Sequence, residues 1–168
     1  MRWLVLLLLL ISSHSLADCA ADSVPYRWIK AIEAQNWDAL QALFAEDSRY
    51  RDPTMAFFDT AEIDLRGPQA IRQFWQESSE DSGTSAIDYT ITHCFQTGGI
   101  AVLTLKVAVT VAGDTWGIKK ESVVLRGAQT SVLRIENDLI VGATDLVDYA
   151  DVMGQVQELK QTYGAHDS

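Results

Sequence analysis

The chain has 168 residues, with 13 lysines and arginines against 23 aspartates and glutamates, and a formal net charge of −10 at pH 7. A surface of this charge repels nucleic acid and anionic lipid, so we expect neither as a partner. His14, His93 and His166 lie too far apart for a recognisable metal-ligand spacing. The sequence therefore predicts no metal site, and we expect no cofactor.

Residues 1–17 have the pattern of a secretory signal peptide. Arg2 precedes an apolar run from Trp3 to Ile11, and small and polar residues follow up to Ala17. A membrane-spanning helix needs about 20 apolar residues, which is more than this run provides. We expect cleavage after Ala17, a secreted or periplasmic protein, and no membrane insertion afterwards. The alternative is a lipoprotein anchored at Cys19, although the residue before a lipidated cysteine is normally Gly, Ala or Ser and not Asp.

Residues 18–168 are predicted to form a single domain, because no Pro/Gly-rich linker, low-complexity block or repeat interrupts them. Two cysteines, Cys19 and Cys94, remain in this part of the chain, and in an oxidising compartment they could pair with one another. We place Cys94 on the outward, polar face of its strand.

Helices are predicted to open the domain. Apolar residues at helical spacing predict a helix over 25–35, and Asn36 is expected to cap a second helix over 37–45. A third helix is predicted over 66–79, with Pro68 at its first turn.

After position 83 the apolar residues recur every second residue, which predicts strands. The first strand is expected to face the core with Ile87, Tyr89, Ile91, His93 and Phe95. Further strands are predicted over 100–111, 116–125, 130–135 and 139–147, and a closing helix over about 149–162. Helices followed by a strongly bent antiparallel sheet favour an α+β fold over a doubly wound one.

Three stretches carry a resemblance to a known superfamily: "LFAED" followed by Asp52-Pro53, "LRGPQAIRQFW", and "ENDLIVGATDLVDY". They resemble the superfamily of nuclear transport factor two, ketosteroid isomerase, scytalone dehydratase and the SnoaL-like cyclases. The resemblance implies a cone-shaped half-barrel, with N-terminal helices packed in the concave face of a curved antiparallel sheet around a deep apolar pocket. This fold hosts isomerases, dehydratases, epoxide hydrolases, cyclases and binding modules, so it specifies function poorly.

Asp52 is the first catalytic candidate, because the resemblance matches it to the base of ketosteroid isomerases. At an apolar pocket wall its carboxylate would lose hydration and become suited to proton transfer at neutral pH. The alternative is that Asp52 starts the turn that Pro53 enforces. Trp28 and Ser131 fall where the isomerases have two oxyanion donors, so we do not expect ketosteroid isomerase activity itself.

Asp145 is the second candidate, because it matches a pocket-facing aspartate of limonene-epoxide-hydrolase-like and SnoaL-like enzymes. Strand alternation predicts that it faces inward together with Val141, Ala143 and Val147. The Arg-x-Asp pair of those hydrolases has no counterpart on the strand that contains Lys106. The alternative is that backbone amides, a lysine or an arginine bind Asp145.

His93 is the third catalytic candidate, as an acid/base partner across the pocket; a hydrogen-bonded core histidine is the alternative. Aromatic residues supply the candidate ligand-binding set: Trp28, Tyr50, Phe57, Trp75, Tyr89 and Trp116. Two functions stay open: a cofactor-free isomerase, dehydratase or cyclase that acts on a small hydrophobic molecule, and a non-catalytic small-molecule-binding or assembly module. A homodimer is the assembly that we expect.

Overall fold

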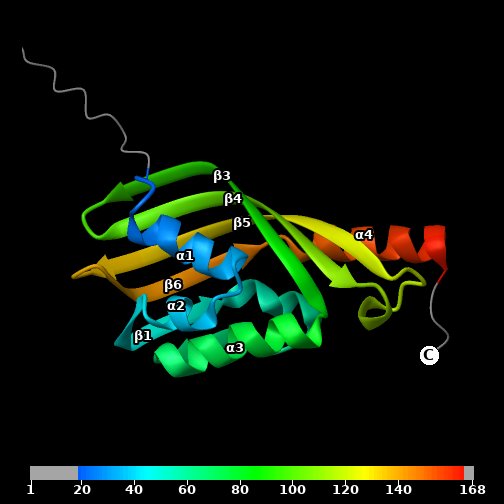
Figure 1. The fold of residues 1–168 in the computed structure, drawn as a ribbon, viewed down its shortest axis with the longest axis horizontal. Coiled ribbons are helices and arrows are strands. Elements are labelled where there is room, and N and C mark those ends of the chain that lie inside the picture. The colour runs from blue at the N-terminus through cyan, green and yellow to red at the C-terminus, as the bar shows by residue number, and fades with distance from the viewer. Residues whose placement is uncertain (1–18, 165–168) are drawn as a thin grey trace, which may run out of the picture.

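The computed structural model describes residues 19–164 (Figure 1). The predicted signal peptide and its cleavage site therefore lie outside the described residues. The chain forms α1 (Val24–Glu33), α2 (Trp37–Gln41), β1 (Phe44–Asp52), the 3₁₀ helix η1 (Pro53–Phe58), β2 (Ile63–Arg66), α3 (Pro68–Asp81), β3 (Thr84–Thr97), β4 (Ile100–Ala112), the 3₁₀ helix η2 (Asp114–Trp116), β5 (Ser122–Glu136), β6 (Leu139–Val147) and α4 (Tyr149–Tyr163).

The six strands make one curved, unclosed sheet in the order β2-β1-β6-β5-β4-β3. Helices α1, α2 and α3 lie on the same side of this sheet, and α4 lies at the end opposite the β3–β4 turn (Figure 1). The predicted α+β half-barrel is confirmed. One strand pair departs from the predicted antiparallel sheet, because β1 runs parallel to β6. Parallel neighbours need a long connection, and these two strands are separated by most of the domain.

The helical segments follow their local signals, with one exception. Asn36 caps α2 as predicted, and its side chain accepts a hydrogen bond of 3.0 Å from the backbone N–H of Ala39. Helix α2 ends at Gln41 and does not reach the predicted position 45. Phe44 instead begins β1 and pairs with Ile140 of β6, so sheet pairing outweighs the local helical pattern.

An irregularity in β3 reverses part of the predicted face of that strand. The pairing with β4 shifts register between Ile91 and His93, and such a bulge moves the following side chains to the opposite face. His93 and Phe95 are therefore exposed, and Cys94 packs against the core. The predictions that His93 faces inward and that Cys94 faces outward are wrong for this reason.

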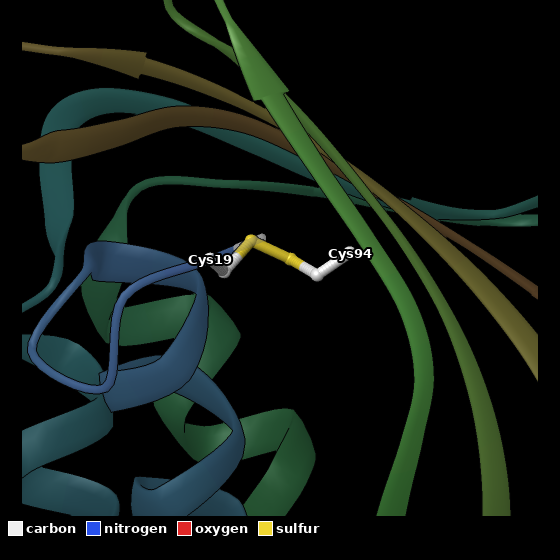
Figure 2. Close-up of a disulfide and its surroundings, with 2 residues drawn as sticks. All are labelled: Cys19 and Cys94. Carbon is white, nitrogen blue, oxygen red and sulfur yellow. A yellow bond between two sulfur atoms is a disulfide. The ribbon is translucent and has the colours of Figure 1, made fainter. Parts of the chain in front are cut away.

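Cys19 and Cys94 form a disulfide, with their Cα atoms 5.5 Å apart (Figure 2). The predicted pairing is confirmed, although Cys94 reaches it from the inward face. The bridge ties the segment that precedes α1 to the C-terminal part of β3, which is an edge strand of the sheet.

The second half of the sheet differs from the predicted strand bounds. Residues 116–121 lie outside any long strand, and β5 then runs without interruption from Ser122 to Glu136. Lys119 and Glu121 fall within the predicted strand 116–125, but they precede β5 in the structure. Strand β6 matches its predicted bounds, but a register shift turns Ile140 inward in place of Val141.

The hydrophobic core has two parts. The larger part lies between α1–α3 and the sheet and includes Trp28, Ile71 and Leu103. The smaller part packs α4 against the C-terminal end of β4 and the N-terminal end of β5. None of the helices within residues 19–164 combines the length and apolarity needed to cross a membrane.

Candidate functional site

A cavity of about 540 Å³ lies between the sheet, η1, α3 and α4. Its wall includes six aromatic side chains: Tyr50, Phe58, Phe74, Trp75, Trp116 and Tyr149. Two carboxylates, Asp52 and Asp145, also line it. A second depression of about 480 Å³ lies beside α2 and β1, but no buried carboxylate lines it. The first cavity is therefore the candidate functional site.

The parallel pairing of β1 with β6 brings the two carboxylates together. Tyr50 pairs with Ala143 and Arg51 with Thr144, so the next residue along each strand is Asp52 on β1 and Asp145 on β6. Two residues 93 positions apart in the chain thus come to neighbouring strands of the sheet. Both are buried, with exposed fractions of 3% for Asp52 and 1% for Asp145.

Asp145 is held by hydroxyl groups on both of its oxygens. Tyr50 donates to Oδ2 at 2.8 Å, and Ser131 donates to Oδ1 at 2.6 Å. The side-chain amide of Gln129 donates in turn to the hydroxyl of Ser131 at 2.9 Å. The inward orientation predicted for Asp145 is confirmed, whereas the alternative of backbone amides, a lysine or an arginine is wrong.

Burial dominates the proton affinity of Asp145. Loss of hydration raises its pKa from 3.8 to about 6, and the hydrogen bonds from Ser131 and Tyr50, together with the adjacent side-chain amide of Gln129, oppose that shift by favouring the carboxylate. The nearby negative charge of Asp52 acts in the same direction as burial. Burial and the charge of Asp145 raise the pKa of Tyr50, so the phenol stays protonated and remains a donor.

Asp52 is both a turn residue and a cavity residue. Its Oδ1 accepts from the backbone N–H of Thr54 at 2.9 Å and from the Thr54 hydroxyl at 2.5 Å, which caps η1. Its Oδ2 accepts from the hydroxyl of Tyr149 at 2.7 Å. The Thr54 hydroxyl also accepts from the backbone N–H of Val147 at 3.0 Å, which connects η1 to the end of β6.

Tyr149 and Phe58 close one side of the cavity. Their rings pack edge to face with centroids 5.1 Å apart, which brings the first turn of α4 against η1. Elsewhere in the cavity wall, Tyr50 contacts Phe74 and Trp75 of α3, each at a centroid distance of 5.9 Å. Burial and the hydrogen bond to Asp52 raise the pKa of Tyr149, which keeps that phenol protonated as well.

The predicted ligand-binding residues separate into three groups. Tyr50, Trp75 and Trp116 line the cavity, and Tyr89 lines a smaller adjoining cavity of about 170 Å³ that shares Trp75. Trp28 is fully buried in the core, and Phe57 points to solvent with 52% of its surface exposed.

The third catalytic candidate does not join the other two. The His93 ring faces solvent on β3 and lies 3.2 Å from the Thr104 hydroxyl. The structure thus brings Asp52 and Asp145 together and leaves His93 outside the cavity.

Tyr149 and Gln129 are cavity residues that the sequence did not indicate as such. An aromatic residue at the start of a helix and a glutamine within a strand have no distinctive pattern. The sequence does not reveal the parallel pairing of β1 with β6. This pairing places the C-terminal ends of both strands side by side, and it therefore brings Asp52 close to the start of α4.

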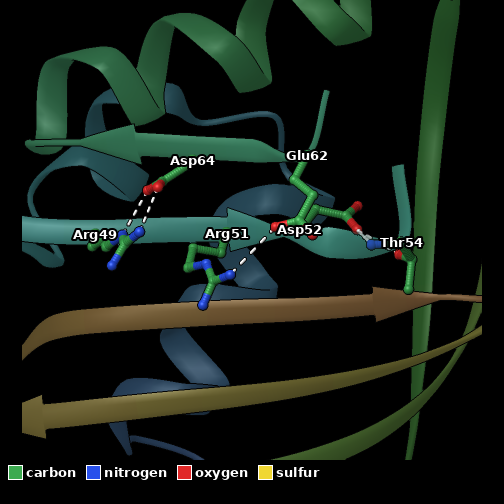
Figure 3. Close-up of polar contacts among 6 residues, drawn as sticks. All are labelled: Arg49, Arg51, Asp52, Thr54, Glu62 and Asp64. Atoms are coloured by element: carbon green, nitrogen blue, oxygen red, sulfur yellow. Dashed lines mark hydrogen bonds and ion pairs between the residues drawn. The ribbon is translucent and has the colours of Figure 1, made fainter. Parts of the chain in front are cut away.

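Basic side chains near the site are directed elsewhere. Figure 3 shows Arg49 paired with Asp64 and Arg51 paired with Glu62, on the segment that leads into and through β2. Within residues 19–164, no lysine, arginine or histidine lines the cavity. In that same part of the chain, no three His, Cys, Asp or Glu side chains converge as metal ligands would.

Solved structures with the same fold come from several bacteria. A protein assigned as a SnoaL-like polyketide cyclase from Shewanella denitrificans aligns with a TM-score of 0.69 and 23% identity, over 80% of this chain and 95% of that one. A protein with a ketosteroid isomerase-like fold from Catenulispora acidiphila was solved in complex with trimethylamine. It aligns with a TM-score of 0.67 and 17% identity, over 82% of this chain and 95% of that one. An LEH-like epoxide hydrolase from M. tuberculosis aligns with a TM-score of 0.62 and 12% identity, over 83% of this chain and 90% of that one. Identities this low establish the fold alone.

Comparison with curated proteins found no significant match. The model of the SnoaL-like domain matches residues 26–143, which is more than half of the 168-residue chain. The matched region contains Tyr50, Asp52 and Ser131, and it ends two residues before Asp145. With the fold and the family model in agreement, the chain belongs to the SnoaL-like domain family.

Proposed function

We propose that this protein is an enzyme of the isomerase, dehydratase or cyclase kind, which moves protons on a small apolar molecule bound in the cavity. One observation carries the proposal. Asp145 is a buried carboxylate on an aromatic cavity wall, and its pKa of about 6 lies close to neutral pH. A general base with such a pKa is largely ionised at pH 7, and after taking a proton it readily returns it.

Asp145 is better suited than Asp52 to act as the base. A carboxylate offers about four lone-pair sites for hydrogen bonds. Asp52 accepts three hydrogen bonds, from Thr54 twice and from Tyr149 once. Asp145 accepts two, which leaves it more capacity to receive a substrate proton. We therefore assign proton transfer to Asp145 and the positioning of Tyr149 to Asp52.

The proposed reaction begins with removal of a proton from a carbon next to a carbonyl group. Asp145 takes that proton, and negative charge develops on the carbonyl oxygen. Tyr50 and Tyr149 both line the cavity with their protons retained, and in the resting site each donates its single proton to a carboxylate, Tyr50 to Asp145 and Tyr149 to Asp52. Once Asp145 has taken the substrate proton it is a weaker acceptor, so we assign to Tyr50 a turn of its hydroxyl from Asp145 to the oxyanion. Return of the proton from Asp145 to another carbon completes an isomerisation. In a cyclisation the carbanion attacks a second carbonyl carbon, and Asp145 returns its proton to the alkoxide that forms there.

The test is a screen of purified protein against apolar ketones, enones, epoxides and linear 1,3-diketones, with substrate loss followed by chromatography. Asp145→Asn keeps the size of the side chain and removes the base, so turnover should fall by about 10²- to 10⁴-fold. Asp47→Asn is the matched control, because Asp47 is an exposed aspartate on β1. It should behave like the wild-type protein.

A non-catalytic binding module predicts a different outcome. A ligand would then be recovered unchanged, and Asp145→Asn would alter only its affinity. That result, together with no turnover of any compound in the screen by the wild-type protein, would refute the enzyme proposal.

We also propose that the protein is exported in soluble form. The pattern of residues 1–17 supports this, as does the disulfide between Cys19 and Cys94, because such bonds persist in oxidising compartments. A Cys19 that is held in a disulfide has no thiol for a lipid anchor. Mass spectrometry of the exported protein should find Asp18 at the N-terminus; a retained Met1 or a diacylated Cys19 would contradict the proposal. The expected homodimer stays a prediction.

A further inference from the structure

The two cavity carboxylates carry negative charge without a positive partner. Asp52 and Asp145 are both buried, and every side chain or backbone group that donates to them is neutral. Buried charges in proteins are normally paired with an opposite charge or bound to a metal. In the described part of the chain, the two arginines that share β1 with Asp52 pair with other acidic residues: Arg49 with Asp64, and Arg51 with Glu62.

The rest of the cavity wall has the chemistry that binds organic cations. Six of its side chains are aromatic, and they come from β1, η1, α3, η2 and α4, so aromatic groups surround the two carboxylates. The face of an aromatic ring carries partial negative charge and attracts ammonium groups, most strongly where water is displaced. Thr60, Ser78 and Ser82 add hydroxyl groups that accept hydrogen bonds from an N–H donor.

We propose that this cavity selects molecules that carry a protonated or quaternary amine on an apolar body, with the ammonium group beside Asp52 and Asp145 and the body against the aromatic wall. The inference rests on the proposed function only in taking the cavity as the substrate site. A volume of about 540 Å³ is within the range of small-molecule sites. Anionic substrates, such as free carboxylic acids, are disfavoured by the same pair of carboxylates.

Three probes with one apolar body test the inference. At pH 7.5, 3-phenylpropylamine is a cation, 3-phenylpropan-1-ol is neutral and 3-phenylpropanoate is an anion. Their affinities for the wild-type protein are measured by isothermal titration calorimetry and by quenching of tryptophan fluorescence. The amine should bind at least tenfold more tightly than the alcohol, and the carboxylate more weakly than the alcohol.

Variants separate the local carboxylates from the overall negative charge of the protein. In the double variant Asp52→Asn with Asp145→Asn, the preference of the amine over the alcohol should fall to within about twofold. The control Asp47→Asn removes an exposed charge from the same strand and should keep the full preference. Near-UV circular dichroism checks that the double variant is folded, and the wild-type comparison of the three probes needs no variant.

The outcomes distinguish this inference from the proposed function. Equal binding of the alcohol and the amine, no binding of any probe, or a preference that survives in the double variant would overturn the cation inference. In each of those cases the enzyme proposal would still stand if the wild-type protein turned over a neutral ketone and the Asp145→Asn variant did not. Selective binding of the amine by a protein that turns over nothing would support the inference and refute the enzyme proposal.

Discussion

Replacement of Asp145 by asparagine should make the protein more stable at neutral pH. The wild-type carboxyl has a pKa of about 6 when folded and an ordinary value of 3.8 when unfolded. A raised pKa means that the folded state binds the proton more tightly than the unfolded state does. Stability from this group is therefore fully present below pH 3.8 and is lost as the pH rises through 6.

The size of the effect follows from the difference of roughly two pKa units. Each unit corresponds to about 1.4 kcal/mol, so ionisation of Asp145 costs the folded state about 3 kcal/mol at high pH. About 2 kcal/mol of that loss develops between pH 4.5 and pH 8 by the same linkage relation. Asparagine does not ionise, and its amide can both accept a hydrogen bond from one hydroxyl and donate to the other.

The assay is urea unfolding of the wild-type and Asp145→Asn proteins at several pH values from 4.5 to 8, with the disulfide intact. The free energy of unfolding of the variant, minus that of the wild type, should increase by about 2 kcal/mol over this range. The exposed control Asp47→Asn should stay within about 0.5 kcal/mol of the wild type. A difference for Asp145→Asn that does not change with pH, or one that decreases above pH 6, would refute the burial argument.

Three further predictions concern single contacts. Joint replacement of Cys19 and Cys94 by serine should lower the free energy of unfolding by about 4 kcal/mol, because the bridge closes a loop with a sequence separation of 75; a loss under about 1 kcal/mol in chemical denaturation would contradict this. Asn36→Ala should cost about 1 kcal/mol in the same assay through loss of the α2 cap, whereas Asn36→Asp should be nearly neutral. Tyr50→Phe removes a donor to Asp145 and should raise the pKa of that carboxyl above about 6; an unchanged titration by NMR would show that the hydrogen bond is unimportant.

Features that depend on local sequence were predicted well. The bounds of β6 agree with its alternating pattern and its flanking turns, and Pro68 and Asn36 mark the starts of their helices as expected. These signals act within a few residues of the chain, so one sequence is sufficient to recognise them.

The face of His93 could not be predicted in the same way. Alternation along β3 is regular in sequence, but the bulge depends on how β3 pairs with β4. A single unpaired residue reverses every side chain that follows it, and no residue near Thr92 distinguishes a bulged strand from a regular one.

The residues that line the candidate site were predicted in part. Asp52 and Asp145 were identified separately, through resemblance to different enzymes, whereas their proximity depends on the pairing of β1 with β6. Strand order is a property of the whole sheet and leaves no trace in either strand alone. Tyr149 follows from the same pairing, since it lies two residues beyond the end of β6, against the Asp52 that ends β1.

The position of these carboxylates is hard to explain by stability alone. The core around them is well supplied with apolar side chains, and an apolar residue in place of Asp145 would avoid the loss of hydration that raises its pKa. Tyr50 and Ser131 each contribute a hydrogen bond that lowers the pKa of Asp145, yet the shift remains. Strained or poorly solvated groups that the surrounding structure supports are typical of functional sites. The predicted gain in stability of Asp145→Asn is therefore also a test of function: a variant that is more stable and inactive would indicate that the carboxylate is kept for its chemistry.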